Sequence, residues 1–250
     1  AAVQCELDGL DWDDPSYVSA RARILDARAY NAVLELTGDR RVPVRCLGLQ
    51  LLGQLGDDRA LPHVIAALGT DDLDVVTGAV HALGHLAAGG VVWDAKLLRK
   101  AVANDDDVLR HAVAGALGSG GMCDRDPEAV RLMLFLAADP DDDVRSWAIF
   151  GLGVQSSADS ELVREALRKA AGEPDPEIRG EALVGLARRK DEQARDRILA
   201  ELEGEETSVL AIEAAEALAD PTLVDALSEL RRLWPDESEA IDSALTACRS

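Results

Sequence analysis

Two features of the 250-residue sequence, a recurring pattern and its near-constant spacing, predict an all-α fold, a right-handed α-solenoid of about six to seven stacked helix pairs. One short pattern recurs six times, and it opens with an aliphatic anchor residue. The anchors are Val44, Val75, Leu109, Val144, Ile178 and Leu210. Their spacings of 31, 34, 35, 34 and 32 residues are typical of stacked units, none of which can bury its apolar face alone.

The recurring pattern predicts the second helix of each pair. Apolar residues stand at the anchor and four, five, eight and nine positions later, which is a helical period rather than a strand-like alternation. Position eight is always leucine: Leu52, Leu83, Leu117, Leu152, Leu186 and Leu218. The next residue is always Gly or Ala. A small residue beside a bulky one lets neighbouring helices approach closely, and glycine costs about 1 kcal/mol in a helix interior, so its recurrence needs such a reason.

A first helix is expected before each of these second helices. The expected ranges are roughly 58–68, 93–103, 127–138, 160–171, 191–203 and 221–233. The Asp-Pro pairs at 126–127 and 220–221 mark helix starts, with Asp as N-cap and Pro in the first turn. Acidic turns precede the second helices, where carboxylates cap backbone amides and meet the positive end of the helix dipole.

The two ends of the chain complete the predicted domain organisation. Residues 1–16 are an acidic N-terminal lead-in or cap, and residues 17–250 form a single repeat solenoid. We expect a helix over 17–36, as the second helix of an incomplete first unit, and a closing helix over 236–248.

Charge and composition exclude several classes of partner. The net charge of −21 opposes binding to nucleic acid and to anionic membranes, and no run of 18 apolar residues is present to span a membrane. A basic protein partner is compatible with this charge, although acidity also simply favours solubility. The four cysteines form no metal-ligand spacing and suggest a reducing compartment, so we expect a cytoplasmic protein.

The repeat resembles HEAT repeats, in the bacterial subtype named for phycobilisome-lyase HEAT-like repeats. The cleanest copy combines Asp143, Val144 and Arg145 with the Gly-Leu-Gly triplet at 151–153, and the resemblance covers about residues 40–235. It implies a HEAT-like solenoid and, for most members, a protein-binding scaffold. It also implies that the arginines after the anchors, Arg45, Arg110, Arg145 and Arg179, form a structural ladder with acidic residues of neighbouring turns. Val76 and Ala211 interrupt that row.

Known enzymes with HEAT-like repeats have sequence features that this chain lacks. None of the four histidines is followed by Glu, as the paired His-Glu motifs of deoxyhypusine hydroxylase require. The acidic composition contradicts the basic face of HEAT-like DNA glycosylases, and no chromophore site of a phycobilin lyase is evident. His81 and His85 have a spacing that can hold a metal, but position 82 is Ala rather than a catalytic Glu, and we expect Cys123 to lie in a loop. We therefore expect no metal, no cofactor and no enzymatic activity.

The second helices also predict a binding face. Positions two, three, six and ten after the anchor are not needed for packing, so they point towards the concave groove of the stack. In the central units they carry His81, His85, His111, Ser146, Trp147, Phe150 and Val154. Exposed aromatics in a groove are typical anchors of binding, although aromatics at helical spacing are more often part of a core.

The sequence therefore favours a non-catalytic scaffold or adaptor that captures a protein partner on its concave face. Trp147 and Phe150 would anchor the partner, the histidines would add polar contacts, and acidic turns would steer a basic partner. An immunity-type protein that neutralises a basic toxin is a specific version. The alternative is an enzyme or lyase-like accessory factor on the same scaffold, and the partner's identity and the oligomeric state are left open.

Overall fold

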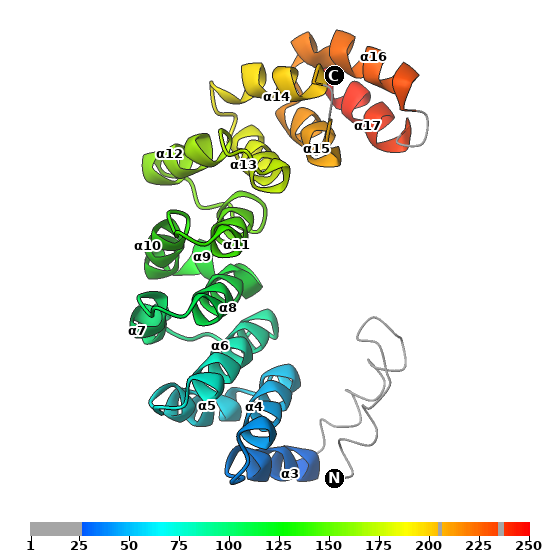
Figure 1. The fold of residues 1–250 in the computed structure, drawn as a ribbon. Helices are drawn as coiled ribbons and strands as arrows, with labels where there is room; N and C mark the ends of the chain where they lie inside the picture. The colour runs from blue at the N-terminus through cyan, green and yellow to red at the C-terminus, as the bar shows by residue number, and fades with distance from the viewer. Residues whose placement is uncertain (1–26, 205–206, 235–237) are drawn as a thin grey trace. The chain divides into compact units, whose positions relative to one another are not determined.

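The computed structural model describes residues 27–204, 207–234 and 238–250, and every regular element in these ranges is a helix (Figure 1). The chain divides into two compact units, one ending at Met122 and one beginning at Cys123, and each is described by itself. The predicted all-α fold of paired, stacked helices is confirmed. None of the described helices combines the length and apolar character needed to cross a membrane. The predicted cap over residues 1–16 lies outside the described residues.

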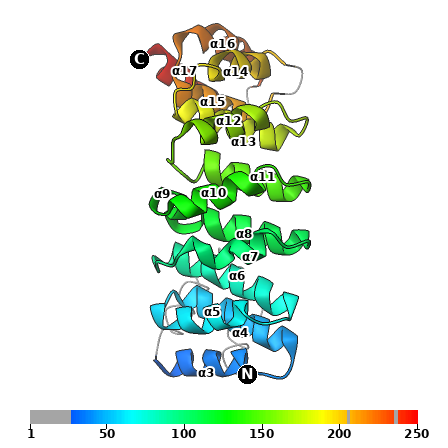
Figure 2. The same cartoon turned by 90° about the vertical axis from the view of Figure 1, so that its left-hand side faces the viewer.

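In unit 1 the second helices form one stack. The elements are α3 (Ala27–Thr37), α4 (Val42–Leu55), η1 (Asp58–Ala60), α5 (Leu61–Leu68), α6 (Leu73–Ala88), η2 (Ala95–Leu98), α7 (Arg99–Val102), α8 (Asp107–Gly118) and η3 (Ser119–Gly121). Helix α4 packs on α6 and α6 on α8, while α3, α5 and α7 each cover the second helix that follows them. Figure 2 views this unit from the side of α5 and α7.

Unit 2 repeats the arrangement. Its elements are α10 (Pro127–Leu136), α11 (Asp142–Gly153), α12 (Glu161–Ala170), α13 (Pro176–Arg188), α14 (Ala194–Leu202), α15 (Val209–Leu218), η4 (Pro221–Leu223), α16 (Val224–Leu233) and α17 (Ser238–Arg249). Helices α11, α13, α15 and α17 pack in succession, and α10, α12, α14 and α16 each pack on the second helix that follows them. The short helix α9 (Met122–Arg125) contains the boundary between the units.

Helix α3 is the first helix of a pair, so its assignment as the second helix of an incomplete unit was wrong. The turn that joins α3 to α4 has the bonding of the other turns inside pairs. Arg45 Nη1 donates to the carbonyl oxygens of Asp39 and Arg40, as Arg145 Nη1 donates to those of Asp139 and Pro140. The part of the predicted helix before residue 27 lies outside the described residues.

The acidic turns cap α6, α8, α11 and α13 as predicted, whereas Ser208 rather than an acidic residue caps α15. The side chains of Asp72, Asp106, Asp141 and Asp175 each accept a hydrogen bond from the backbone amide of the anchor residue three positions later. Each carboxylate thereby satisfies an amide that the first turn of the helix leaves unpaired, next to the positive end of the helix dipole. The aspartates before Pro127 and Pro221 are N-caps as well.

The leucines at position eight lie in the core, with one exception. Leu52, Leu83, Leu117, Leu152 and Leu186 are all fully buried. Leu218 is only half-buried, because it is the last residue of α15 and Ala219 turns the chain away with a left-handed φ of 54°. The predicted core position is therefore wrong for this last copy of the pattern.

The small residues at position nine lie where second helices touch. A Cβ atom on Gly53 would stand 2.7 Å from the Cα of Ala82, and one on Gly153 would stand 2.8 Å from the carbonyl oxygen of Glu181. Gly153 also faces Gly185, which stands at position seven of its own repeat, and a Cβ on Gly185 would stand 2.6 Å from the Cα of Gly153. Backbone atoms cannot move aside as a flexible side chain can, so these glycines have the packing reason that their recurrence requires.

The arginines after the anchors brace each turn, and Arg45, Arg145 and Arg179 also reach an acid of the next pair. In all four, Nη1 donates to the carbonyl oxygens five and six residues earlier. Within unit 1, Arg45 also pairs with Asp72 at 2.9 Å. Within unit 2, Arg145 pairs with Glu173 at 3.4 Å and Arg179 with Glu201 at 2.6 Å. Glu201 lies on α14 rather than in a turn, so the ladder extends beyond the predicted turn acids.

Helix α9 replaces the loop that we expected around Cys123. Asp124 anchors it, because its Oδ1 accepts hydrogen bonds from the Ser156 hydroxyl at 2.8 Å and the Ser157 amide at 2.7 Å. Cys123 is buried in this helix, and burial raises the pKa of its thiol to about 12. The expected loop position was therefore wrong, and the thiol is unreactive at neutral pH.

Truncation of a position-eight leucine tests the stacking register. Leu152→Ala should lower the free energy of unfolding by about 2–5 kcal/mol, because a fully buried side chain is replaced by a cavity. Leu162→Ala on α12 is the matched control, since that leucine is 64% exposed. Urea denaturation monitored by circular dichroism compares the two. Equal midpoints for both variants would show that the register is misassigned.

The arginine ladder makes a second prediction about stability. Arg145→Ala should cost about 1–3 kcal/mol, because it removes charge-assisted hydrogen bonds to two backbone carbonyls and to Glu173. Lys169→Ala removes an exposed positive charge nearby in the sequence and should change stability little. Calorimetric melting temperatures give the comparison, and indistinguishable values would remove the structural role of the ladder.

Candidate functional site

The residues predicted to bind a partner fall into two groups, one in each unit. His81, His85 and His111 belong to unit 1, on α6 and α8. Ser146, Trp147, Phe150 and Val154 belong to unit 2, on α11 or directly after it. Each group is therefore described as a surface of its own unit.

Trp147 and Phe150 form an aromatic pair on the open side of α11. Their ring centroids are 5.9 Å apart, and the rings meet edge to face with an interplanar angle of 86°. Trp147 is 42% exposed and Phe150 is half-buried, so neither ring is part of the closed core. The anchor, Val144, and the residue four positions after it, Ala148, are fully buried on the other side of the helix, as the helical phase predicts.

A hollow of about 240 Å³ opens beside this pair, between α11 and α13. It is lined by Ser146, Trp147, Phe150, Glu177 and Glu181. Val154 does not line it; the backbone carbonyl of Val154 accepts a hydrogen bond from Arg188 Nη1 at 2.5 Å. The structure thus brings three of the four predicted residues of unit 2 together, with two glutamates from the next pair.

Glu181 is the chemically unusual member of the hollow. The residue is 7% exposed, and its buried Oε2 has no hydrogen-bond partner among the described residues. Burial raises its pKa from the ordinary 4.5 to about 7, and the neighbouring charges of Glu177 and Asp175 act in the same direction. A buried carboxylate without a donor is costly, so this group favours its protonated form or a cation brought to it.

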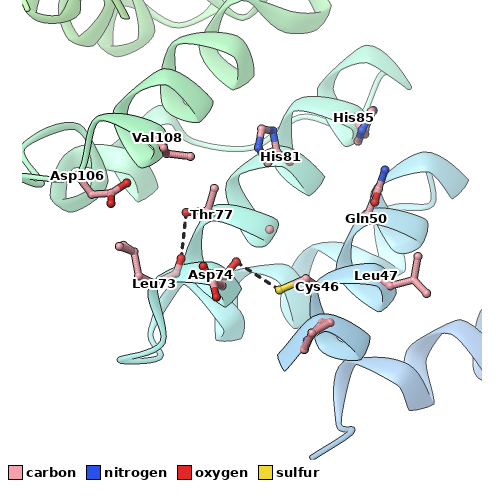
Figure 3. Close-up of a pocket in the computed structure, with 12 residues that line it drawn as sticks. Cys46, Leu47, Gln50, Leu73, Asp74, Thr77, His81, His85, Asp106 and Val108 are labelled. Atoms are coloured by element: carbon pink, nitrogen blue, oxygen red, sulfur yellow. Dashed lines mark hydrogen bonds between the residues drawn. The ribbon is translucent and has the colours of Figure 1, made fainter. Parts of the chain in front are cut away.

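Unit 1 carries a larger and more polar hollow of about 680 Å³ (Figure 3). Helices α4 and α6 and the start of α8 supply its lining: Pro43, Cys46, Leu47, Gln50, Leu73, Asp74, Thr77, Gly78, His81, His85, Asp106 and Val108. Leu73 and Val108 are 39% and 61% exposed, respectively. His111 does not line the hollow, although it lies near enough to act on His81.

The titratable groups of this hollow are suited to binding contacts rather than to catalysis. Desolvation lowers the pKa of His81, and the neighbouring His111 lowers it further, so the His81 ring is neutral at pH 7. The Cys46 thiol donates to the Asp74 carbonyl oxygen at 3.4 Å, and burial raises its pKa. No group of three or more His, Cys, Asp or Glu side chains in the described part of the chain could hold a metal ion.

Glu181 is the residue that our choice of binding residues missed. It stands three positions after the anchor Ile178, as Trp147 stands three positions after Val144. Adjacent second helices stack in register, so equivalent positions of successive repeats become neighbours. The acidic residue at position three, in the repeat that follows the one with Trp147, was therefore a sequence signal that could have identified Glu181.

Comparisons with known proteins agree with this architecture. A sequence model of HEAT repeats matches residues 30–118 and 129–219, which is more than half of the chain. The chain is 25% identical to Protein YibA of Escherichia coli (strain K12) over 237 residues, covering 90% of this chain and 82% of that protein. An X-ray structure of YibA from E. coli superposes with a TM-score of 0.71 at 23% identity, covering 99% of this chain and 91% of that one. A designed armadillo repeat protein in complex with the peptide (KR)4 gives a TM-score of 0.52 at 15% identity, covering 74% and 97%, respectively.

The buried carboxyl group predicts a pH-dependent stability. Because the pKa of Glu181 is raised in the folded state, folded protein retains a proton that unfolded protein releases between about pH 4.5 and 7. The contribution of Glu181 to the free energy of unfolding is fully present below pH 4.5 and is lost as pH rises through 7. Glu181→Gln should therefore be more stable than the wild type at pH 8, by up to about 3 kcal/mol, with the difference disappearing near pH 4.5.

Urea denaturation at a series of pH values measures this difference. Glu165→Gln removes the same charge from an exposed position on α12, so its stability relative to the wild type should vary little with pH. A Glu181→Gln curve parallel to the wild type across the whole range would contradict the raised pKa.

Proposed function

The chain belongs to the HEAT-repeat family, and we propose that it is a non-catalytic scaffold that captures a protein partner on the open face of its second helices. Repeat scaffolds of this kind present successive helices as one extended surface, so a partner can contact several repeats at once. The proposal includes a cytoplasmic location and requires no metal and no cofactor.

The exposed aromatic pair of α11 is the observation that carries this proposal. The sequence has only 3% aromatic residues, yet Trp147 is 42% exposed beside Phe150, above a hollow. Tryptophan and other aromatic anchors next to a pocket dominate the binding energy of many protein interfaces. In unit 1, exposed Leu73 and Val108 line the second hollow and add apolar surface of the kind that protein contacts bury.

Charge supports a basic partner. The net charge of −21 raises the local concentration of cationic segments and accelerates their association at low salt. The aromatic hollow itself is lined by two glutamates and no basic residue. A designed armadillo repeat protein of similar fold is described in complex with the alternating basic peptide (KR)4, and this precedent supports a basic segment as the partner. A basic toxin held inactive by this chain is a specific version of the proposal.

The chemistry of the described thiols and histidines supports a role without catalysis. Burial raises the pKa of the Cys46, Cys123 and Cys248 thiols, whereas a nucleophilic cysteine needs a lowered pKa. His81 is held neutral by desolvation and by a second histidine, with no carboxylate among the causes of its shift. A general base would need an orienting partner of that kind.

Truncation of the aromatic anchor tests the proposal. We expect Trp147→Ala to weaken capture of the partner from native cell extract at least about fivefold, through a faster off-rate, because truncating a central anchor costs more than about 1 kcal/mol. Phe135→Ala is the matched control, since Phe135 is 58% exposed on the first helix α10. Surface plasmon resonance with the captured partner gives both rates.

Two outcomes of this comparison between Trp147→Ala and Phe135→Ala would contradict the proposal. Loss of binding in Phe135→Ala with full affinity in Trp147→Ala would place the partner on the first-helix face. Equal wild-type affinity in both variants would show that the aromatic pair anchors nothing.

A further inference from the structure

We propose that the hollow between α11 and α13 receives one cationic side chain, arginine or lysine, from the partner polypeptide. This inference rests on the proposed scaffold function and names the chemistry of its anchor site. Three observations within unit 2 support it: the aromatic wall, the unsatisfied carboxylate, and the engagement of the nearby basic side chains with other acids.

The aromatic wall suits a cation. Trp147 and Phe150 lie edge to face, so their rings present differently oriented surfaces to the hollow. The negative face of an aromatic ring attracts an ammonium or guanidinium group, and tryptophan is the strongest such partner. The volume of about 240 Å³ lies below the roughly 300–1,000 Å³ of pockets for drug-sized ligands, so the hollow suits a single side chain.

The carboxylate supplies the second half of the site. Glu181 is more than nine-tenths buried, lines the hollow, and leaves Oε2 without a donor. Buried polar atoms in folded proteins nearly always have a partner, and an exception calls for an explanation. A guanidinium or ammonium group entering the hollow would donate to this carboxylate and form the charge-assisted bond that the free protein lacks.

Basic side chains of the same helices are engaged elsewhere. Arg145 of α11 pairs with Asp142 and Glu173, and Arg179 of α13 pairs with Glu201. Arg188, at the end of α13, pairs with Glu213. The charges that act on Glu181 are instead those of Glu177 and Asp175, both negative. The hollow therefore offers uncompensated negative potential to a cation from outside.

Occupation by a cation has a pH signature. In the free protein the pKa of Glu181 is about 7, raised by burial and by those two acids, while the bound cation requires the ionised form. Binding at neutral pH therefore releases a proton. The affinity should fall about tenfold between pH 8 and pH 6, because the ionised fraction falls by that factor.

Fluorine NMR of protein labelled with 5-fluorotryptophan tests the site without any partner. The chain has four tryptophans, and a Trp147→Phe sample assigns the resonance of Trp147. The probes are Nα-acetyl-arginine amide, Nα-acetyl-lysine amide and, as the neutral isostere of arginine, Nα-acetyl-citrulline amide. The two cationic probes should shift the Trp147 resonance saturably at pH 8, and the citrulline probe should not.

Two variants separate this site from the general acidity of the chain. Glu181→Gln should weaken the cationic probes at least tenfold and remove the pH dependence, while Glu165→Gln, with the same charge change at an exposed position, should bind as the wild type does. Equal shifts by citrulline, wild-type affinity in Glu181→Gln, or equal shifts of all four tryptophans would overturn the inference. Partner capture that depends on Trp147 but not on Glu181 would overturn it while leaving the scaffold function intact.

Discussion

Close contact between the backbones of consecutive second helices is the constraint on which the other features depend. Gly153 of α11 and Gly185 of α13 lie so close that a Cβ on Gly185 would meet Gly153 at 2.6 Å. Packing at this distance fixes the register of the two helices, because neither can slide without a backbone clash. The same register brings Glu181 beside Trp147 and Phe150, so the candidate site follows directly from the stacking of the core.

Acidic residues have two separable roles in this chain. Some are structural: Asp141 caps α11, Glu173 receives Arg145, and Asp191, which is 3% exposed, receives both Arg164 and Arg168. Paired or capping carboxylates of this kind stabilise the ends of helices and the contacts between repeats. Glu181 neither caps a helix nor pairs with an arginine among the described residues, so its carboxylate is available to an external cation.

Sequence periodicity predicted the repeated parts of the fold well and the unrepeated parts poorly. The capping role of Asp72 and the burial of Leu152 follow from positions that recur in several repeats. Helix α9 occurs only once, so sequence periodicity could not predict it. It is held in place by hydrogen bonds from two serines, more than 30 residues away, to Asp124. The exposure of Trp147 followed from helical phase, and the equivalent repeat position of Glu181 could be read from the sequence, whereas the burial of Glu181 beside the aromatic pair could not.

The two phenylalanines of the chain allow a direct test of which face captures the partner. Phe150 lies on second helix α11 and Phe135 on first helix α10, so the photo-crosslinking residue p-benzoylphenylalanine can replace each in turn. Photo-crosslinking in the native cell followed by mass spectrometry identifies what each position touches. The account predicts that position 150 crosslinks to a polypeptide through a lysine- or arginine-containing segment and that position 135 does not. Crosslinks from position 135 alone would contradict it.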